Sequence, residues 1–270
     1  MSNATLNRSY MFVPGDSEKK LGKAQDLGAD ALILDLEDSV AEPNKATARD
    51  MTRDYLVARR NNTASELWVR VNPLDTRHTL ADLVAIMQGA PAGIFLPKSN
   101  HGDDVKTLDN YLSALEQQNG IEIGSTGVIS LAESALGMMN LSTFIACSPR
   151  LRAFAWGAED MAADLGASTN VDENGDYFLV HQLTRANTLT VCAAGGLQPV
   201  DSVFVDFSNE EGLRAECERG RQEGFTAKMA IHPAQIAVIN ECFTPSEEEI
   251  EHARRVIKAF EDAGDVGAVG

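Results

Sequence analysis

Short apolar runs alternate with longer amphipathic stretches along almost the whole chain. The apolar runs have the length of buried β-strands, and we expect strands at residues 10–13, 31–36, 67–71, 93–96, 128–131, 153–156, 197–200 and 227–231. The stretches between them have helical periodicity, and we expect helices at residues 17–27, 44–59, 103–118, 134–146, 177–194, 209–223 and 246–263. Eight strands alternating with helices predict an α/β fold, a TIM (β/α)8 barrel.

A doubly wound parallel sheet is the alternative architecture for this alternation. The dinucleotide-binding form of that sheet carries a GxGxxG motif after its first strand, and no such motif follows residues 10–13. A chain of 270 residues fits one barrel. We therefore expect a single domain over residues 1–270, with residues 1–7 as a flexible N-terminus or tag and residues 245–270 as a terminal helix and tail.

Composition argues against two classes of protein. The 23 basic and 40 acidic residues give a net charge of −17, whereas a nucleic-acid binder needs a basic face. No apolar run approaches the roughly eighteen residues of a membrane span, and the N-terminus has no signal-peptide pattern. Four scattered cysteines without a CxxC motif fit the reduced thiols of a cytoplasmic protein.

Polar and charged residues gather where the predicted strands end. They are Asp16, Asp35, Glu37, Asp38, Arg70, Asn72, Lys98, Glu133, Glu159, Asp160, Asp201 and His232. The carboxyl ends of barrel strands share one rim, and active sites of TIM barrels lie there. This convergence predicts an active site at that rim. The three acids in Asp35–Asp38 could instead cap the following helix.

Glu133 and Asp160 follow adjacent predicted strands and could approach one cation. Two carboxylates, completed by water and substrate oxygens, suit Mg²⁺. No histidine pair accompanies them, which argues against zinc. Taken singly, each acid could also be a helix N-terminal residue stabilised by the helix dipole.

The basic residues leave alternatives open. Arg70 could grip a substrate carboxylate with its bidentate fork, or form a structural salt bridge to Glu37 or Asp38. Lys19 and Lys23, with Lys20 between them, could bind phosphates near a helix N-terminus, or lie on a solvated helix face. His232 fits a structural role better than that of a catalytic base.

Several segments, in order, resemble the citrate lyase β-subunit-like (CitE-like) family of the HpcH/HpaI aldolase superfamily, which includes malyl-CoA and citramalyl-CoA lyases. The matching segments are residues 8–15, 34–41, 70–75, 96–98, 156–160 and 230–235, and the resemblance extends from Arg8 to about Ala263. It implies a TIM barrel that forms homotrimers or hexamers.

The resemblance also implies roles for residues. Glu133 and Asp160 would be the Mg²⁺ ligands, and Glu37 and Asp38 would orient the metal and its waters. Arg70 would hold the carboxylate of an α-keto acid or hydroxyacid. Family positions that contact CoA match Phe12, Lys19 and Lys23.

Two features depart from the family pattern. Glu133 follows Ser130-Leu131-Ala132 instead of the usual Ile/Leu-Ile sequence. Family members continue past the terminal helix into a lid with an acid–base Asp, and this sequence ends at Gly270, so we expect the lid to be absent, by nature or by truncation. The role of that Asp is not assigned to Asp265.

The activity implied is Mg²⁺-dependent cleavage or formation of a 3-hydroxyacyl-CoA thioester of the citryl, malyl or citramalyl type, giving an α-keto acid and acetyl-CoA. Three alternatives remain, of which the thioesterase shares the metal site. They are a pyruvate/aldehyde aldolase, a carrier-dependent citrate lyase β-subunit that is inactive alone, and a malyl-CoA thioesterase. The acyl group is not fixed by the sequence, because one methyl group is worth only about 1–3 kcal/mol of discrimination.

Overall fold

The computed structural model describes residues 6–60 and 64–264. Residues 1–5 of the expected N-terminal tag, residues 265–270 of the expected tail and hence Asp265 lie outside the described residues.

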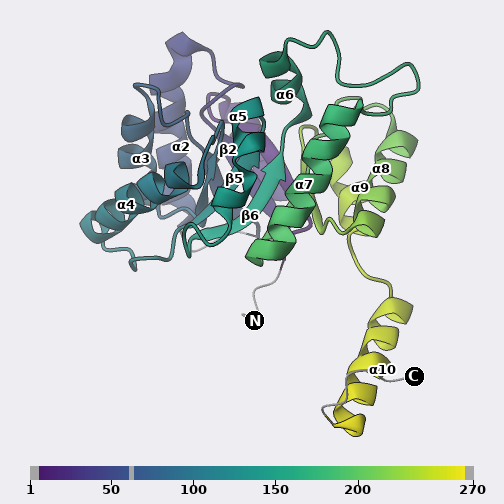
Figure 1. Ribbon diagram of the computed structural model, residues 1–270. Helices are drawn as coiled ribbons and strands as arrows, with labels where there is room; N and C mark the ends of the chain where they lie inside the picture. The colour runs from purple at the N-terminus through teal and green to yellow at the C-terminus, as the bar shows by residue number, and fades with distance from the viewer. Residues whose placement is uncertain (1–5, 61–63, 265–270) are drawn as a thin grey trace.

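Eight parallel strands close into a barrel, in which each strand pairs with the next along the chain and β8 pairs back to β1 (Figure 1). The strands are β1 (Ser9–Pro14), β2 (Ala31–Asp35), β3 (Glu66–Arg70), β4 (Gly93–Leu96), β5 (Gly127–Ala132), β6 (Leu151–Trp156), β7 (Gln198–Asp201) and β8 (Ala227–Ala230). The closed order confirms the predicted TIM barrel and excludes the doubly wound sheet.

Ten α-helices are found in the described residues: α1 (Glu18–Lys23), α2 (Lys45–Arg59), α3 (Thr79–Ile86), α4 (Gly102–Asn119), α5 (Ala135–Met139), α6 (Ala158–Leu165), α7 (Leu179–Gly195), α8 (Glu210–Glu223), α9 (Gln235–Cys242) and α10 (Glu247–Ala263). The predicted helices at residues 17–27 and 134–146 each divide into a short α-helix and a 3₁₀ turn. Helices α3, α6 and α9 were not predicted, because eight residues show too few periods for the pattern to be read.

Side chains of the strands alternate between the inside of the barrel and its outer face, as the pleat of a β-strand requires. The inner layers include Tyr10, Ile33, Trp68, Phe95, Ile129, Leu131, Ala155, Val200 and Met229. Gly93 makes room for this filling, because a Cβ there would meet the Trp68 ring at 2.1 Å. The outer face packs against the helices and forms the larger core. This parity decides which polar residues near the strand ends point into the barrel.

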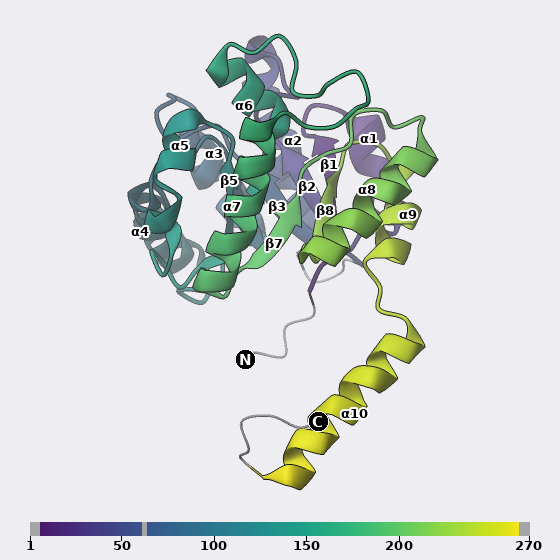
Figure 2. The ribbon, with the colours of Figure 1, turned by 45° about the vertical axis from the view of Figure 1, so that its right-hand side comes forward.

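Helix α10 stands away from the barrel, at the end opposite α6, in both views (Figure 1, Figure 2). Its capping box is complete, because the Ser246 hydroxyl accepts from the Glu249 amide while the Glu249 carboxylate accepts from the Ser246 amide. Ile257 and Phe260 of α10 are exposed. Within residues 6–60 and 64–264, none of the helices has the length and apolar character needed to cross a membrane.

Candidate active site

A pocket of about 280 Å³ opens at the carboxyl ends of the strands. Its walls include Phe12, Lys20, Asp35, Ser39, Arg70, Leu131, Glu133, Gly157, Glu159, Asp160, Ser202, Met229 and Ile231. Some of these wall residues belong to a larger set of charged residues that we call the rim cluster: Asp35, Glu37, Asp38, Arg70, Lys98, Glu133 and Asp160. These residues come from the ends of β2 to β5 and from α6, so the structure brings together most of the acids predicted at the rim.

Asp35 and Arg70 form the innermost ion pair of the rim cluster. They face each other in the register of β2 and β3, and the guanidinium binds Asp35 through Nε at 2.7 Å and Nη2 at 2.6 Å. Asp35 also accepts from the Glu37 and Ser39 amides. Burial alone would raise the pKa of Asp35, but Arg70 and these donors hold it below its ordinary value.

The bidentate fork of Arg70 is therefore already engaged by a protein carboxylate. The structural salt bridge considered from the sequence exists, but its main partner is Asp35, with Glu37 at 3.1 Å and Asp38 at 3.9 Å from Nη1. The guanidinium lies 4.6 Å from the centre of the Phe12 ring. Arg70 thus presents only its Nη1 side towards the other acids and the pocket.

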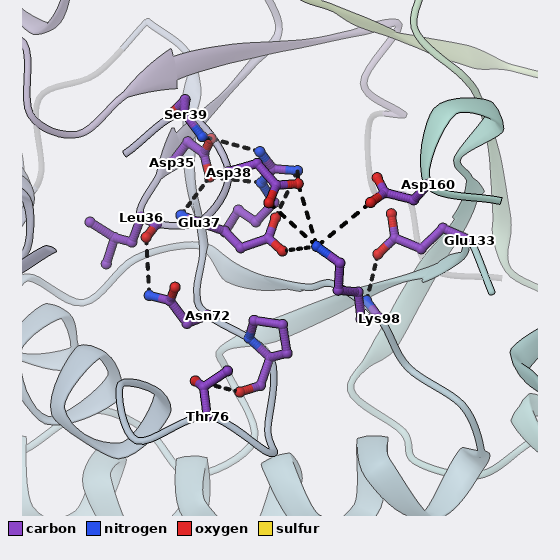
Figure 3. Close-up of polar contacts among 12 residues, drawn as sticks. Asp35, Leu36, Glu37, Asp38, Ser39, Asn72, Thr76, Lys98, Glu133 and Asp160 are labelled. Carbon is purple, nitrogen blue, oxygen red and sulfur yellow. Dashed lines mark hydrogen bonds and ion pairs between the residues drawn. The ribbon is translucent and has the colours of Figure 1, made fainter. Parts of the chain in front are cut away.

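Lys98 connects the acids on the two sides of the rim cluster (Figure 3). Its ammonium forms a short hydrogen bond to Glu37 and lies 3.4 Å from Asp38 and 3.6 Å from Asp160. Burial raises the pKa of Glu37 despite the nearby cations, and the buried Oε2 atom of Glu37 forms an ion pair with Arg70 Nη1 but no hydrogen bond. Glu37 is therefore an acid whose burial is only partly compensated.

Glu133 and Asp160 lie side by side and face Lys98 (Figure 3). Glu133 is buried, and its Oε1 accepts from the Lys98 amide at 2.5 Å. Burial, reinforced by the Asp160 carboxylate, raises the pKa of Glu133 well above its ordinary value. Gly157 permits this packing, because a Cβ there would lie 3.0 Å from the Glu133 Cβ. Two neighbouring carboxylates, one buried and short of positive charge, make a place that favours a cation.

The donor set fits a hard divalent cation such as Mg²⁺. Mg²⁺ takes one or two protein carboxylates and keeps several waters or substrate oxygens. Glu133 and Asp160 supply that number, and no group of three or more His, Cys, Asp or Glu side chains with a metal-site arrangement occurs in residues 6–60 and 64–264. The Lys98 ammonium lies 3.6 Å from the Asp160 carboxylate.

The three lysines of α1 are exposed, and they differ in position. Lys20 lines the pocket, whereas Lys19 and Lys23 are not part of its wall. Phe12 does line the pocket. A role for Lys19 and Lys23 in binding CoA stays a prediction. Lys20 is the α1 lysine that lines the pocket, and it becomes a further candidate for contact with the substrate.

Asp201 ends β7 as expected, but its side chain does not join the other polar residues of the rim, so that part of the prediction is wrong. Val200 points into the barrel, so Asp201 points outwards, where it accepts from Arg185 at 2.9 Å and from the Trp156 indole at 2.7 Å. Lys228, outward on β8, completes this group, which we call the outer network: Arg185, Asp201, Glu216, Glu223 and Lys228.

His232 has the structural setting that the sequence favoured. Its ring stacks on Phe207 with centres 4.5 Å apart, and Nδ1 accepts from the Ala234 amide at 3.3 Å. It is not part of the pocket wall.

Sequence reasoning placed Lys98 at a strand end but gave it no role. Its contacts depend on a backbone φ of 50°, which a residue pattern does not reveal. A usable signal was present, however: Lys98 lies two residues after the end of β4, between the strand ends that carry the acids.

Comparisons with known proteins identify the family of this chain. The sequence model of the family described as HpcH/HpaI aldolase/citrate lyase matches residues 8–233. A (3S)-malyl-CoA thioesterase of Cereibacter sphaeroides is 39% identical over 256 residues, 95% of this chain and 84% of that protein. An L-malyl-CoA/β-methylmalyl-CoA lyase of Rhodobacter capsulatus is 35% identical over 284 residues, 98% of this chain and 87% of that protein.

A solved structure shares the fold over nearly the whole chain. It is CitE from Mycobacterium tuberculosis in complex with magnesium, acetoacetate and coenzyme A, with a TM-score of 0.76 and 31% identity. The similarity covers 97% of this chain and 89% of that one.

Proposed function

Because the chain belongs to the HpcH/HpaI aldolase/citrate lyase family, we propose that it is a Mg²⁺-dependent carbon–carbon lyase. Its substrate class would be 3-hydroxyacyl-CoA thioesters of the citryl, malyl or citramalyl type, and its products an α-keto acid and acetyl-CoA. The observation that carries the proposal is the pair Glu133 and Asp160, which faces the pocket at the carboxyl ends of the strands. The magnesium and coenzyme A in the CitE complex support the choice of ion and thioester.

Glu133 and Asp160 would hold the ion, which would supply Lewis-acid stabilisation of negative charge on substrate oxygens. Arg70 would place its Nη1 side against the carboxylate of the keto-acid part, because Asp35 fixes the rest of the guanidinium. Glu37 and Asp38 would orient water around the site, since Lys98 holds both carboxylates. Together these residues would bind and orient the bond to be cleaved.

The pocket volume indicates which part of the substrate would lie inside the pocket. A space of about 280 Å³ accommodates a small keto acid or acyl group and is too small for a whole CoA molecule. The pantetheine and nucleotide would therefore extend over the rim, where α1 carries Lys19, Lys20 and Lys23. Screening of positive charge there by salt would weaken thioester binding.

A thioesterase is the second candidate, because the Cereibacter sphaeroides relative with that name is 39% identical. Product analysis separates the two reactions. The purified chain would be incubated with malyl-CoA and Mg²⁺, and the products identified by mass spectrometry. A lyase gives glyoxylate and acetyl-CoA, whereas a thioesterase gives malate and free CoA.

The control variant is Glu122→Gln, an exposed acid outside the pocket wall. We expect Glu133→Gln and Asp160→Asn to lose turnover and Glu122→Gln to keep it. Malate and CoA as the main products would replace the lyase proposal by the thioesterase. Turnover of pyruvate with an aldehyde, without any thioester reaction, would favour the aldolase, and activity only with an acyl-carrier protein would favour the citrate lyase subunit.

We also propose that the chain self-associates through α10, as a homotrimer or hexamer. None of the described residues of α10 is buried, and Ile250, Val256, Ile257 and Phe260 lie exposed along it. An apolar helix surface of this kind marks an association site. Light scattering would show an oligomer for the wild type and a smaller species for Ile257→Glu combined with Phe260→Glu; a monomeric wild type would contradict the proposal. Localisation in the cytoplasm stays a proposal as well.

A further inference from the structure

Lys98 is the residue that touches the largest share of the rim cluster's acids. Its ammonium is bonded to Glu37, and lies 3.4 Å from Asp38 and 3.6 Å from Asp160. Its backbone amide donates to Glu133 at 2.5 Å. One residue therefore contacts both proposed ligands of the ion and both acids beside them.

The backbone of Lys98 is held in an unusual conformation. Its φ of 50° lies in the left-handed region, which is unfavourable for a residue with a side chain. Such strain is retained when the surroundings determine it, and it is found preferentially at functional sites. Here the conformation directs the amide towards Glu133 while the side chain reaches Glu37 and Asp160.

The charge balance of the rim cluster shows which acids each cation faces. The rim cluster has five acids and two cations, Arg70 and Lys98, so its formal charge with all groups ionised is 2 − 5 = −3. Arg70 is directed to Asp35 and Glu37. Lys98 is thus the cation that faces Asp160.

We propose that Lys98 is a positioning residue whose ammonium competes with the divalent ion for the Asp160 carboxylate. This inference rests on the proposed function, because it takes Glu133 and Asp160 as the ligands. A divalent ion held by Asp160 would be repelled by the neighbouring ammonium, which Glu37 and Asp38 keep beside the site. The charge of Lys98 would thus lower the affinity of the site for the ion.

A purely structural salt bridge makes the opposite prediction for metal affinity. If Lys98 only supports the shape of the site, its removal loosens the ligands and weakens metal binding. If its charge competes with the ion, its removal strengthens metal binding. The sign of the change therefore separates the two roles.

The test is Mg²⁺ binding by calorimetry, repeated with Mn²⁺ by electron paramagnetic resonance, on the wild type and three variants. Lys98→Met removes the charge and keeps a long side chain. Lys98→Gly removes the charge, and glycine adopts a positive φ without steric strain. Lys98→Arg keeps the charge and is the matched control. Circular dichroism and thermal melting establish that each variant is folded.

We expect Lys98→Met and Lys98→Gly to bind the ion at least about tenfold more tightly than the wild type, because one repelling charge is gone. Lys98→Arg should stay within about threefold of the wild type, since the charge is unchanged. Equal or weaker binding by both neutral variants in the folded state would overturn the inference. A wild type that binds neither ion would overturn the proposed metal site, and the inference with it.

Discussion

The rim cluster and the outer network both bury charged side chains beside the barrel strands, but they balance those charges differently. In the outer network, the fully buried Lys228 meets Glu216 at 2.5 Å, and Asp201 is bound by Arg185 and Trp156. Burial opposes ionisation there, yet the surrounding cations hold the pKa of Asp201 below its ordinary value. In the rim cluster, burial raises the pKa of both Glu133 and Glu37.

The two groups differ in the direction in which their side chains leave the strands. Asp201 and Lys228 point outwards between the barrel and its helices, where partners on α7 and α8 complete their bonds. Glu133 points into the open end of the barrel, where the pocket leaves room for a ligand instead of a partner. Buried acids that are fully paired thus indicate a structural role, and buried acids that are underpaired at a pocket indicate a binding site.

The largest expected effect is on the outer network. Asp201→Ala leaves buried cations without their shared acid, and breaking such a network should cost about 3–5 kcal/mol of unfolding free energy. Urea unfolding followed by circular dichroism measures it. Asp160→Asn is the comparison in the rim cluster and should change stability by less than about 1 kcal/mol, as for most partly exposed sites. Similar losses of unfolding free energy in both variants would contradict the proposed difference between the outer network and the rim cluster.

A smaller effect is expected for Arg70→Lys, which replaces the bidentate contact to Asp35 by a single one. The loss of a charged hydrogen bond should cost roughly 1.5–3 kcal/mol. The lowered pKa of Asp35 gives stability that is present above its unfolded pKa and is lost as pH falls through the folded one. The variant weakens this contribution, so its acid-unfolding midpoint should move to higher pH. An unchanged midpoint would show that Arg70 does not set the pKa of Asp35.

The smallest expected effect is a gain in stability, and it concerns Glu133. The pKa of Glu133 is raised in the folded state, so the folded state binds its proton more tightly than the unfolded chain does. Stability of the metal-free protein therefore falls as pH rises above the unfolded pKa, and the loss is complete above the folded pKa. Glu133→Gln removes this loss and should raise the melting temperature by a few degrees near pH 8, with less gain at pH 5. A lower melting temperature for Glu133→Gln than for the wild type at both pH values would contradict this prediction.

The strands and the barrel were predictable because they depend on apolar runs, which the sequence displays directly. The meeting of Asp35 and Arg70 was also within reach, since both are the last residues of neighbouring strands. The outward direction of the Asp201 side chain could have been predicted, because Asp201 follows the apolar Val200 and successive side chains of a strand point to opposite faces. The position of Lys98 near a strand end was visible in the sequence, but its contacts were not, because they depend on a positive φ and on a backbone amide that donates to Glu133.

The most direct test of the central claim is Mg²⁺ titration of the metal-free protein by calorimetry, with Glu133→Gln, Asp160→Asn and the control Glu122→Gln. The wild type and Glu122→Gln should each bind one ion, and both rim variants should lose that binding while remaining folded. Binding of the ion with unchanged affinity by Glu133→Gln and Asp160→Asn would show that the underpaired acids of the rim cluster are not the metal site.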